Sequence, residues 1–376
     1  MKKLLFIIPL CTLLALCSCK TNNGGSTTES VNTDKVSVSE LYNGIEDIQG
    51  KAYKKFTMPE KITKNECNDV YNLTLGYSNE KQDLSQLTQK GEKLVTAFSE
   101  KSLDDSKGLL VDNFRYDYTD NDFYCDVDMY DGFSATLNSN ENINDEVTDF
   151  ELYNIPREDN AGKSYNLKTG TMTAQQAAEF ADKFMVENLK DFTGDLLPQT
   201  KYVCAYNSES ADCFHIVAEY TYEGIPLDMN LSPFFPANNN DLVYYLDTVS
   251  DMKISSADSI ESICANSNYV VKKADKIEKL ISLQDAVNIL DDQLAENSSY
   301  NFSDCELMYC HINHQQGQNE VVNPDDIVID TTITYDFSPV WCFYIQKDCN
   351  DLQSLKSPDT IRVDALSGEV TFVKNG

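Results

Sequence analysis

Residues 361–370 read Ile-Arg-Val-Asp-Ala-Leu-Ser-Gly-Glu-Val, and this stretch decides the architecture of the C-terminal part of the chain. Its apolar side chains at 361, 363 and 365 alternate with polar ones, which predicts a strand with one buried face. Gly368 can adopt a positive φ, so Asp364 to Glu369 is expected to reverse the chain. Val370 and Phe372 then lie on one face of a returning strand, and the two strands make an antiparallel hairpin.

Two upstream stretches complete this C-terminal unit, residues 273–376. Ser282, with Asp285 three residues later, predicts the start of a helix, and Trp341, the only tryptophan, is expected in the core. The buried side of that helix is expected to consist of Ala286, Ile289, Leu290 and Leu294. Further strands are expected at 306–312, 327–335 and 340–346.

A similar plan occurs earlier in the chain. In residues 171–272, Thr173 and Gln176 form a capping box that opens a helix, and strands are expected at 202–206, 214–222, 242–246 and 252–254. In residues 41–170, strands at 71–77, 114–118, 123–137 and 150–155 accompany a helix over 83–102, in which Gly91 is a weak position. The sequence therefore predicts an α+β fold of tandem modules, each with one helix packed on an antiparallel sheet.

The C-terminal residues resemble a known family. Ser-Leu-Gln-Asp-Ala at 282–286, Ser-Pro-Val-Trp-Cys-Phe at 338–343 and the hairpin at 361–370 are similar to the helix opening, strand and hairpin of PepSY-like domains, and to envelope regulators of the YycH and YycI kind. The resemblance covers residues 274–376 and, more faintly, 173–228. It implies a role in peptidase inhibition or envelope signalling, and none of its motifs is catalytic.

The N-terminus resembles a bacterial lipoprotein signal. Lys2 and Lys3 precede an apolar run too short to span a membrane, and Leu16, Ser18 and Cys19 match the lipobox, with Cys17 at a permissive position. We expect residues 1–18 to be a signal peptide and Cys19 to carry lipid, including palmitate. Residues 19–40 are rich in Thr, Asn, Gly and Ser, which predicts a flexible tether. This places the protein on the extracytoplasmic face of the cell membrane.

Charge limits the classes of partner. The chain carries a formal net charge of −31, and it becomes more negative when Lys2 and Lys3 leave with the signal. Nucleic acids and anionic lipid head groups repel such a chain. Membrane attachment is therefore expected to depend on lipid at Cys19, and the expected partner is a protein or peptide of the cell envelope.

Metal and cofactor sites are weakly indicated. Cys305, Cys310, His311 and His314 could bind zinc, but successive side chains of a strand point to opposite faces, so a strand with buried cysteine and exposed histidine is the preferred interpretation. The acidic stretch 117–131 lacks the ligand spacing of a calcium loop and fits half-buried strands better. No cofactor is expected.

Nine cysteines follow Cys19, an odd number. Cys204 and Cys213 flank a polar stretch between two aromatic-rich runs, and a hairpin centred near Ser208 and Glu209 would place them opposite each other. A disulfide at this site and two buried thiols are both open interpretations.

The chain contains only three histidines and no recognisable hydrolase or phosphate-binding motif. We therefore expect a non-enzymatic lipoprotein that binds a protein or peptide partner, as a regulator or peptidase inhibitor. The alternative is an extracytoplasmic protein that binds or hydrolyses a small ligand at an unrecognised site.

Substitution of Cys19 tests the expected anchor. Cys19→Ala should release the protein from membranes or leave it unprocessed, because no other segment is expected to hold it there. Cell fractionation with immunoblotting measures this, and a fully processed variant that stays in the membrane fraction would contradict the lipobox interpretation.

Overall fold

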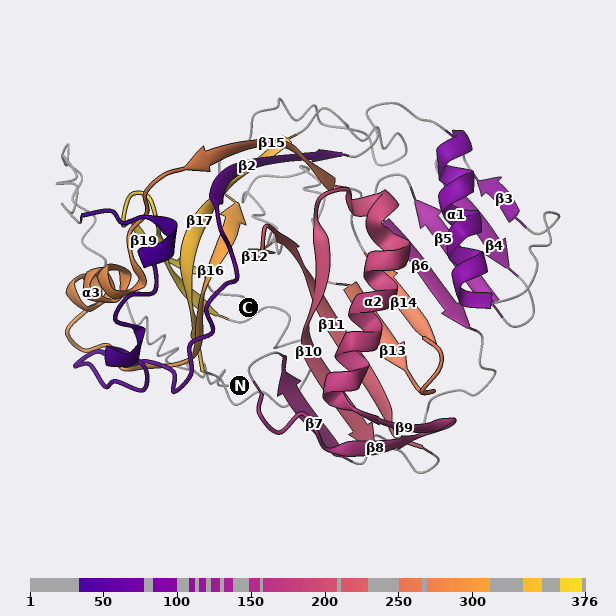
Figure 1. Cartoon of the computed structure of the whole chain (residues 1–376), viewed down its shortest axis with the longest axis horizontal. Coiled ribbons are helices and arrows are strands. Elements are labelled where there is room, and N and C mark those ends of the chain that lie inside the picture. The colour runs from indigo at the N-terminus through magenta and orange to yellow at the C-terminus, as the bar shows by residue number, and fades with distance from the viewer. Residues whose placement is uncertain are drawn as a thin grey trace, which may run out of the picture. The chain divides into compact units, whose positions relative to one another are not determined.

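The structure is a computed structural model of the whole chain. It describes residues 34–77, 84–99, 108–111, 115–119, 123–128, 132–137, 149–155, 158–207, 211–228, 250–265, 269–311, 334–346 and 359–373. Within these ranges the protein is a strand-rich α+β fold. Its strands, apart from a small hairpin of β8 (Ser164–Leu167) and β9 (Gly170–Thr173), form one continuous hydrogen-bonded network (Figure 1). That network consists of two sheets, here called the first and the second sheet.

The first sheet is antiparallel throughout its described part. Alternating apolar and polar residues favour such a sheet, because only one of its faces is buried. Its strands are, in spatial order, β3 (Gly108–Val111), β4 (Arg115–Thr119), β5 (Phe123–Asp128), β6 (Gly132–Leu137), β14 (Ser262–Ala265), β13 (Ser250–Ile254), β11 (Cys213–Tyr222), β10 (Leu197–Asn207) and β7 (Asp149–Asn154).

The second sheet is centred on the antiparallel pair β16 (Tyr300–His311) and β17 (Thr334–Ile345). Two strand pairs follow one another along the same side of β17. The first half of β17 pairs with β2 (Val70–Tyr77), which in turn pairs with β15 (Tyr269–Ile277). The second half pairs with β18 (Thr360–Asp364), which in turn pairs with β19 (Val370–Val373). On the other side, β1 (Phe56–Thr57) and β12 (Ile225–Asp228) each pair with β16 in the parallel direction.

Strand β12 connects the two sheets. It pairs with β11 of the first sheet through Tyr222 and Ile225 and with β16 of the second through Leu227 and Asp228. The two residues between β11 and β12, Glu223 and Gly224, both have positive φ, at 51° and 80°. This is the conformation of a type I′ hairpin turn, which requires a residue such as glycine that tolerates the left-handed region.

Each helix packs on strands. Helix α1 (Leu84–Ser99) contacts β4, β5 and β6, and α2 (Ala174–Thr193) contacts β10 and β11, as Figure 1 shows. Helix α3 (Leu283–Gln293) contacts β18. The Oγ1 atom of Thr173 accepts a hydrogen bond from the backbone of Gln176, and Ser282 caps α3 in the same way. The predicted helices and caps are therefore confirmed.

Gly91, predicted to weaken α1, has a packing function. A Cβ atom at this position would lie 2.1 Å from the ring of Tyr116 on β4. The missing side chain lets the helix approach the sheet directly over that ring, so the cost in helix propensity is offset by closer packing.

The core of the second sheet contains the predicted hairpin residues. Ile361, Val363 and Ala365 are fully buried, and Gly368 has a φ of 77° in the turn that follows. Trp341 is also fully buried, and its Nε1 donates a hydrogen bond of 2.9 Å to the carbonyl of Ile281. The indole is thus a packed core residue with a satisfied donor, as expected.

The N-terminal segment folds against this same core. Val36 exchanges two backbone hydrogen bonds with Leu280, at 2.8 and 3.0 Å, and a short 3-10 helix, η1 (Val38–Glu40), follows. Leu41 after it is fully buried, as is Ile48 after a second short helix, η2 (Ile45–Asp47). The folded part therefore includes residues 34–40, which the sequence pattern assigns to the flexible tether. Polar residues can belong to the folded part when their backbone groups pair with a neighbouring segment or form a helix cap.

The sheets cross the predicted module boundaries at 170/171 and 272/273. Strands β1 and β2, from the predicted N-terminal domain, belong to the second sheet, whereas β3 to β7 join β10, β11, β13 and β14 in the first. Sequence periodicity reports the local element, but strand pairing joins residues hundreds of positions apart. Each predicted module is one continuous stretch of sequence, but the strands of the N-terminal and central modules do not all belong to the same sheet.

The two strands predicted at 327–335 and 340–346 are parts of one strand, β17, which runs through Pro339. Residues 327–333 lie outside the described residues, as does the strand predicted at 242–246. A proline inside a central strand is unusual because it has no N–H to donate. Here β17 pairs with β2 up to Phe337 and with β18 from Val340, so Pro339 lies where the neighbour on that side changes.

Gly224→Ala should destabilise the junction between the sheets. A Cβ atom there would lie 2.2 Å from the carbonyl oxygen of Glu66, and a non-glycine residue at this φ costs about 1–3 kcal/mol before any clash. Gly162→Ala is the matched control, since no atom lies within 4 Å of its Cβ position, and it should change stability by less than about 0.5 kcal/mol. Urea unfolding of both variants measures the difference, and equal midpoints would contradict the role of Gly224.

Candidate functional site: a polar layer on the second sheet

The central pair of the second sheet has two different faces. One face, with Leu307, Trp341 and Phe343, lies in the apolar core. The other face gathers charged and sulfur-containing side chains that are almost all buried. We call this set the polar layer, and it consists of Lys201, Glu219, Asp228, Glu306, Met308, Cys310, Cys342, Tyr344 and Arg362.

Lys201 of the first sheet links the polar layer to both sheets. Its Nζ donates to Glu219 of the first sheet at 2.7 Å and to Glu306 of the second at 3.0 Å. The side chains of Lys201, Glu219 and Glu306 are only 13%, 19% and 6% exposed. Tyr344 completes the group, because its hydroxyl donates to Glu306 at 2.6 Å.

A β-bulge positions this lysine. In the ladder of β10 with β11, Thr200 pairs with Ala218 and Tyr202 with Val217, so Lys201 is the extra residue. A bulge redirects the side chain that it carries. The bulge therefore aims Lys201 at the second sheet.

Protonation in the layer follows from these contacts. Burial by itself lowers the pKa of Lys201, but Glu219 and Glu306 outweigh it and hold the pKa well above the ordinary value, so the amine stays charged. Burial and the neighbouring Glu306 raise the pKa of Tyr344 well above its usual range. The tyrosine is therefore a neutral hydrogen-bond donor to a carboxylate.

The other end of the layer holds a second ion pair and two thiols. Arg362 of β18 bonds to Asp228 of β12. Between those strands, the Sγ atoms of Cys310 and Cys342 are 3.6 Å apart. The contact with Cys310, together with burial, raises the pKa of Cys342 well above that of an ordinary thiol. Cys342 therefore does not have the lowered pKa of a catalytic nucleophile.

Glu151 of β7 is the centre of a separate polar cluster. Its carboxylate accepts hydrogen bonds from Lys163, from the hydroxyl of Tyr153 at 2.6 Å and from that of Tyr165 at 2.5 Å. These three donors, Lys163 foremost, lower the pKa of Glu151 to about 2. Since all donors are occupied by one carboxylate, the cluster fixes β8 against the first sheet rather than presenting a reactive group.

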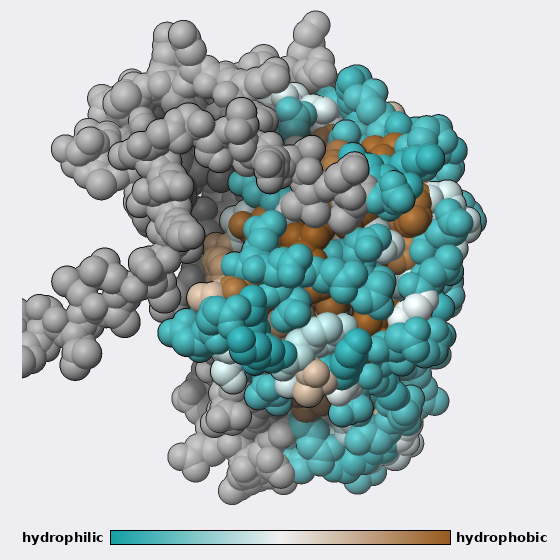
Figure 2. Space-filling model, turned by 90° about the vertical axis from the view of Figure 1, so that its left-hand side faces the viewer, coloured by the Kyte–Doolittle hydropathy of each residue, from teal (hydrophilic) through white to brown (hydrophobic). Residues whose placement is uncertain are grey.

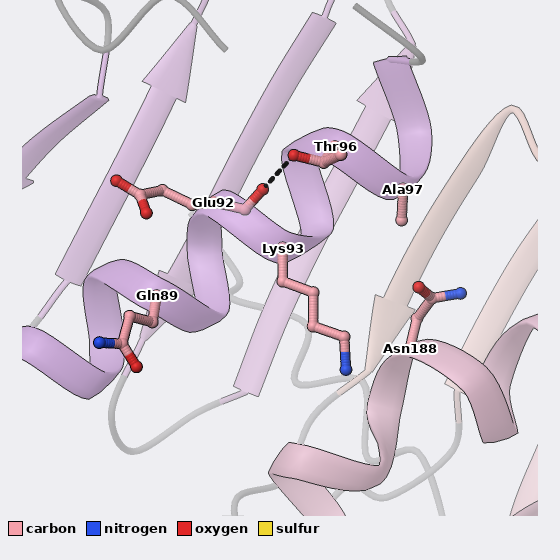
Figure 3. A pocket seen from close by; sticks show the side chains of 6 residues that line it. All are labelled: Gln89, Glu92, Lys93, Thr96, Ala97 and Asn188. Atoms are coloured by element: carbon pink, nitrogen blue, oxygen red, sulfur yellow. Dashed lines mark hydrogen bonds between the residues drawn. The ribbon is translucent and has the colours of Figure 1, made fainter. Parts of the chain in front are cut away.

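A shallow groove lies between α1 and α2 (Figure 3). Its volume is about 430 Å³, and one of its walls is tied together by a hydrogen bond of 2.9 Å from the Thr96 hydroxyl to the carbonyl of Glu92. The side chains that line it are Gln89, Glu92, Lys93, Thr96 and Ala97 from α1 and Asn188 from α2. The groove is open to solvent, unlike the enclosed pockets that hold most small ligands.

The structure separates the weak zinc candidates. Cys305 lies in the apolar core on one face of β16 and Cys310 in the polar layer on the other, while His314 lies outside the described residues. His311, at the end of β16, packs edge-on near Tyr335 and Phe337. In the described part of the chain, no three residues among His, Cys, Asp and Glu come close enough to bind one metal.

The predicted register of Cys204 and Cys213 is wrong by two residues. The hairpin of β10 and β11 exists, but Cys204 lies opposite His215, and Cys213 lies opposite Tyr206. Both cysteines are thiols. The sequence predicts a loop centred at 208–209, whereas the observed ladder is centred one residue later. The pattern of apolar and polar residues is compatible with both registers and does not distinguish between them.

Residues 1–33, with Cys19 and the predicted signal peptide, lie outside the described residues. No helix within the described ranges combines the length and the apolar composition needed to cross a membrane.

Comparison with known proteins finds no matching protein family, and no curated protein matches the chain. Among solved structures, the chain is similar to an uncharacterized protein from Eubacterium rectale, at 13% identity and a TM-score of 0.44, covering 86% of this chain and 92% of the other. It is also similar to the YpeB C-terminal domain from Bacillus megaterium, at 15% identity and a TM-score of 0.31, covering 77% of this chain and 97% of that domain.

Lys201→Met should strongly destabilise the fold. Removing one member of a buried ion pair leaves charge without a partner, at a cost of about 3–5 kcal/mol. Lys183→Met is the matched control, because Lys183 on α2 is 71% exposed in its pair with Glu187 and should contribute less than about 0.5 kcal/mol. Denaturant unfolding compares the two variants, and similar losses would show that Lys201 does not join the sheets.

Proposed function

We propose that the protein is a non-enzymatic lipoprotein, anchored through Cys19 on the extracytoplasmic face of the cell membrane, that binds an extended segment of a protein or peptide partner. The observation that carries this proposal is the open edge of the second sheet at β19. Residues 273–376, which form this edge, are proposed to be a PepSY-like module with a regulatory or peptidase-inhibitory role.

Strand β19 has the features of a docking edge. It pairs only with β18 among the described strands, so its other side has backbone groups available for an added strand. Phe372 on this strand is 51% exposed, and its ring lies 6.2 Å from that of Tyr300. An exposed aromatic beside an unpaired strand edge supplies both an apolar anchor and a hydrogen-bonding template.

The surroundings of the edge favour a basic or neutral partner. Hydrophilic residues cover most of the described face that carries α3 and β19, with hydrophobic residues between them (Figure 2). The chain as a whole has a net charge of −31, which repels acidic segments and attracts basic ones. A basic extended segment is therefore the proposed occupant.

The polar layer supports a binding role over a catalytic one. Its acidic groups, Glu219, Glu306 and Asp228, all bond to cations within the layer. Catalytic acids and bases need access to substrate and a pKa near the working pH. Here the layer serves to hold the second sheet, and with it β19, in a fixed position.

The groove between α1 and α2 favours the alternative function, small-ligand binding. It has room for a small polar molecule and is lined by amide, hydroxyl, carboxylate and amine groups. We rank it second because it is shallow and open.

Site-directed photo-crosslinking tests the proposal. A photoreactive residue at position 372 should capture one protein from intact cells, whereas position 186 is the control, since Val186 on α2 is similarly exposed at 46%. Phe372→Glu should weaken binding of the captured protein at least about tenfold, a loss of about 1.4 kcal/mol, and Val186→Glu should not.

Equal capture at both positions would contradict a specific edge. A tightly bound small molecule, with no captured protein, would favour the alternative function.

A further inference from the structure

We propose that Cys310, Cys342 and Met308 form a binding site for a soft monovalent metal ion of the Cu(I) type. The three residues belong to one buried cluster on the polar face of β16 and β17, together with Val340 and Tyr344. This site shares only Cys310 with the zinc set suggested by the sequence, which combined residues from both faces of β16.

The spacing of the two thiols fits a shared metal. Their Sγ atoms are 3.6 Å apart. Two sulfur ligands at about 2.3 Å from one tetrahedral metal ion are about 3.8 Å apart, so both could bind the same ion after a shift of a few tenths of an ångström.

The strand register argues against a structural disulfide. Cys310 lies opposite Ser338 and Cys342 opposite Glu306, four positions apart along the ladder. A disulfide needs Cα atoms within about 7 Å, which residues so far out of register do not reach without backbone movement. The thiols can therefore approach one another through their side chains but are poorly placed for a covalent bond.

The character of the ligands selects the class of metal. The carboxylates beside the sulfurs are already engaged, Glu306 by Lys201 and Tyr344, and Asp228 by Arg362. What is left on this part of the face is two thiols and a thioether, and sulfur ligands without oxygen or nitrogen favour Cu(I) over Mg²⁺ or Ca²⁺. Zinc normally takes four ligands, and the described residues offer no such set here.

Met308 and Arg362 complete the site. The hydroxyl of Tyr344, two residues from Cys342, lies 2.7 Å from the Sδ atom of Met308, which places the thioether on the same side as the thiols. Arg362 interacts electrostatically with both cysteines. One Cu(I) ion displaces one proton from each thiol, so the bound form carries one net negative charge, which the guanidinium can balance.

Metal titration of the purified, reduced full-length chain tests this inference. Cu(I), supplied under anaerobic conditions in competition with a chromogenic chelator, should bind at one equivalent. Alkylation is carried out in mild denaturant, in which the metal-free chain exposes its buried thiols, and binding should protect Cys310 and Cys342 more than any other cysteine, as mapped by mass spectrometry. The stoichiometric binding should be lost in Cys310→Ser and in Cys342→Ser, and Met308→Leu should weaken it.

Cys305→Ala is the matched control, because Cys305 is a buried cysteine of the same strand on the opposite face, and it should retain full binding. If a serine variant fails to fold, the alkylation pattern of the unmodified chain still decides the site. Protection of a different pair of cysteines, or no stoichiometric binding, would overturn the inference. A Cys310–Cys342 disulfide in protein isolated from its native envelope would also overturn it.

Discussion

The bond network of Lys201 is the interaction on which the arrangement of the two sheets depends. One amine, removed from solvent, is shared by a carboxylate of the first sheet and a carboxylate of the second, and a tyrosine hydroxyl supports the latter. Burying three charges costs several kcal/mol per ion unless the geometry satisfies all of them. The network is therefore intolerant of small displacements, and it fixes the second sheet relative to β10 and β11 more specifically than apolar contacts could.

Two backbone features make that network possible. The bulge at Lys201 directs the side chain out of the first sheet, and the type I′ turn at Glu223 and Gly224 carries the chain from β11 into β12, directly beside β16. Asp228 at the end of β12 then reaches Arg362 across the second sheet. The charged contacts and the chain crossover thus support the same junction, one through side chains and the other through the backbone.

The charged and sulfur-containing side chains of the polar layer are almost all buried, and this bears on the proposed role of the protein. A lysine and a thiol with shifted pKa values are enclosed in the polar layer together with the carboxylates that pair with its cations, whereas the described part of the second sheet presents a strand edge at β19 and an exposed aromatic side chain. A rigid sheet with an open edge at β19 is suited to binding an extended chain. The enclosed sulfur atoms at the far end of the layer are suited to a soft metal ion rather than to a reaction with an external substrate.

The sequence by itself determined the local elements: the capped helices that begin after Thr173 and Ser282, the hairpin around Gly368 and the burial of Trp341. These depend on caps, turn residues and periodicity within about twenty positions. Only the tertiary structure decided that β2 lies between β15 and β17, that Cys204 faces His215, and that Lys201 meets Glu306. Strand order, a two-residue shift in register and a single bulge leave the alternating pattern unchanged, so the same pattern is compatible with several pairings, and long-range packing selects among them.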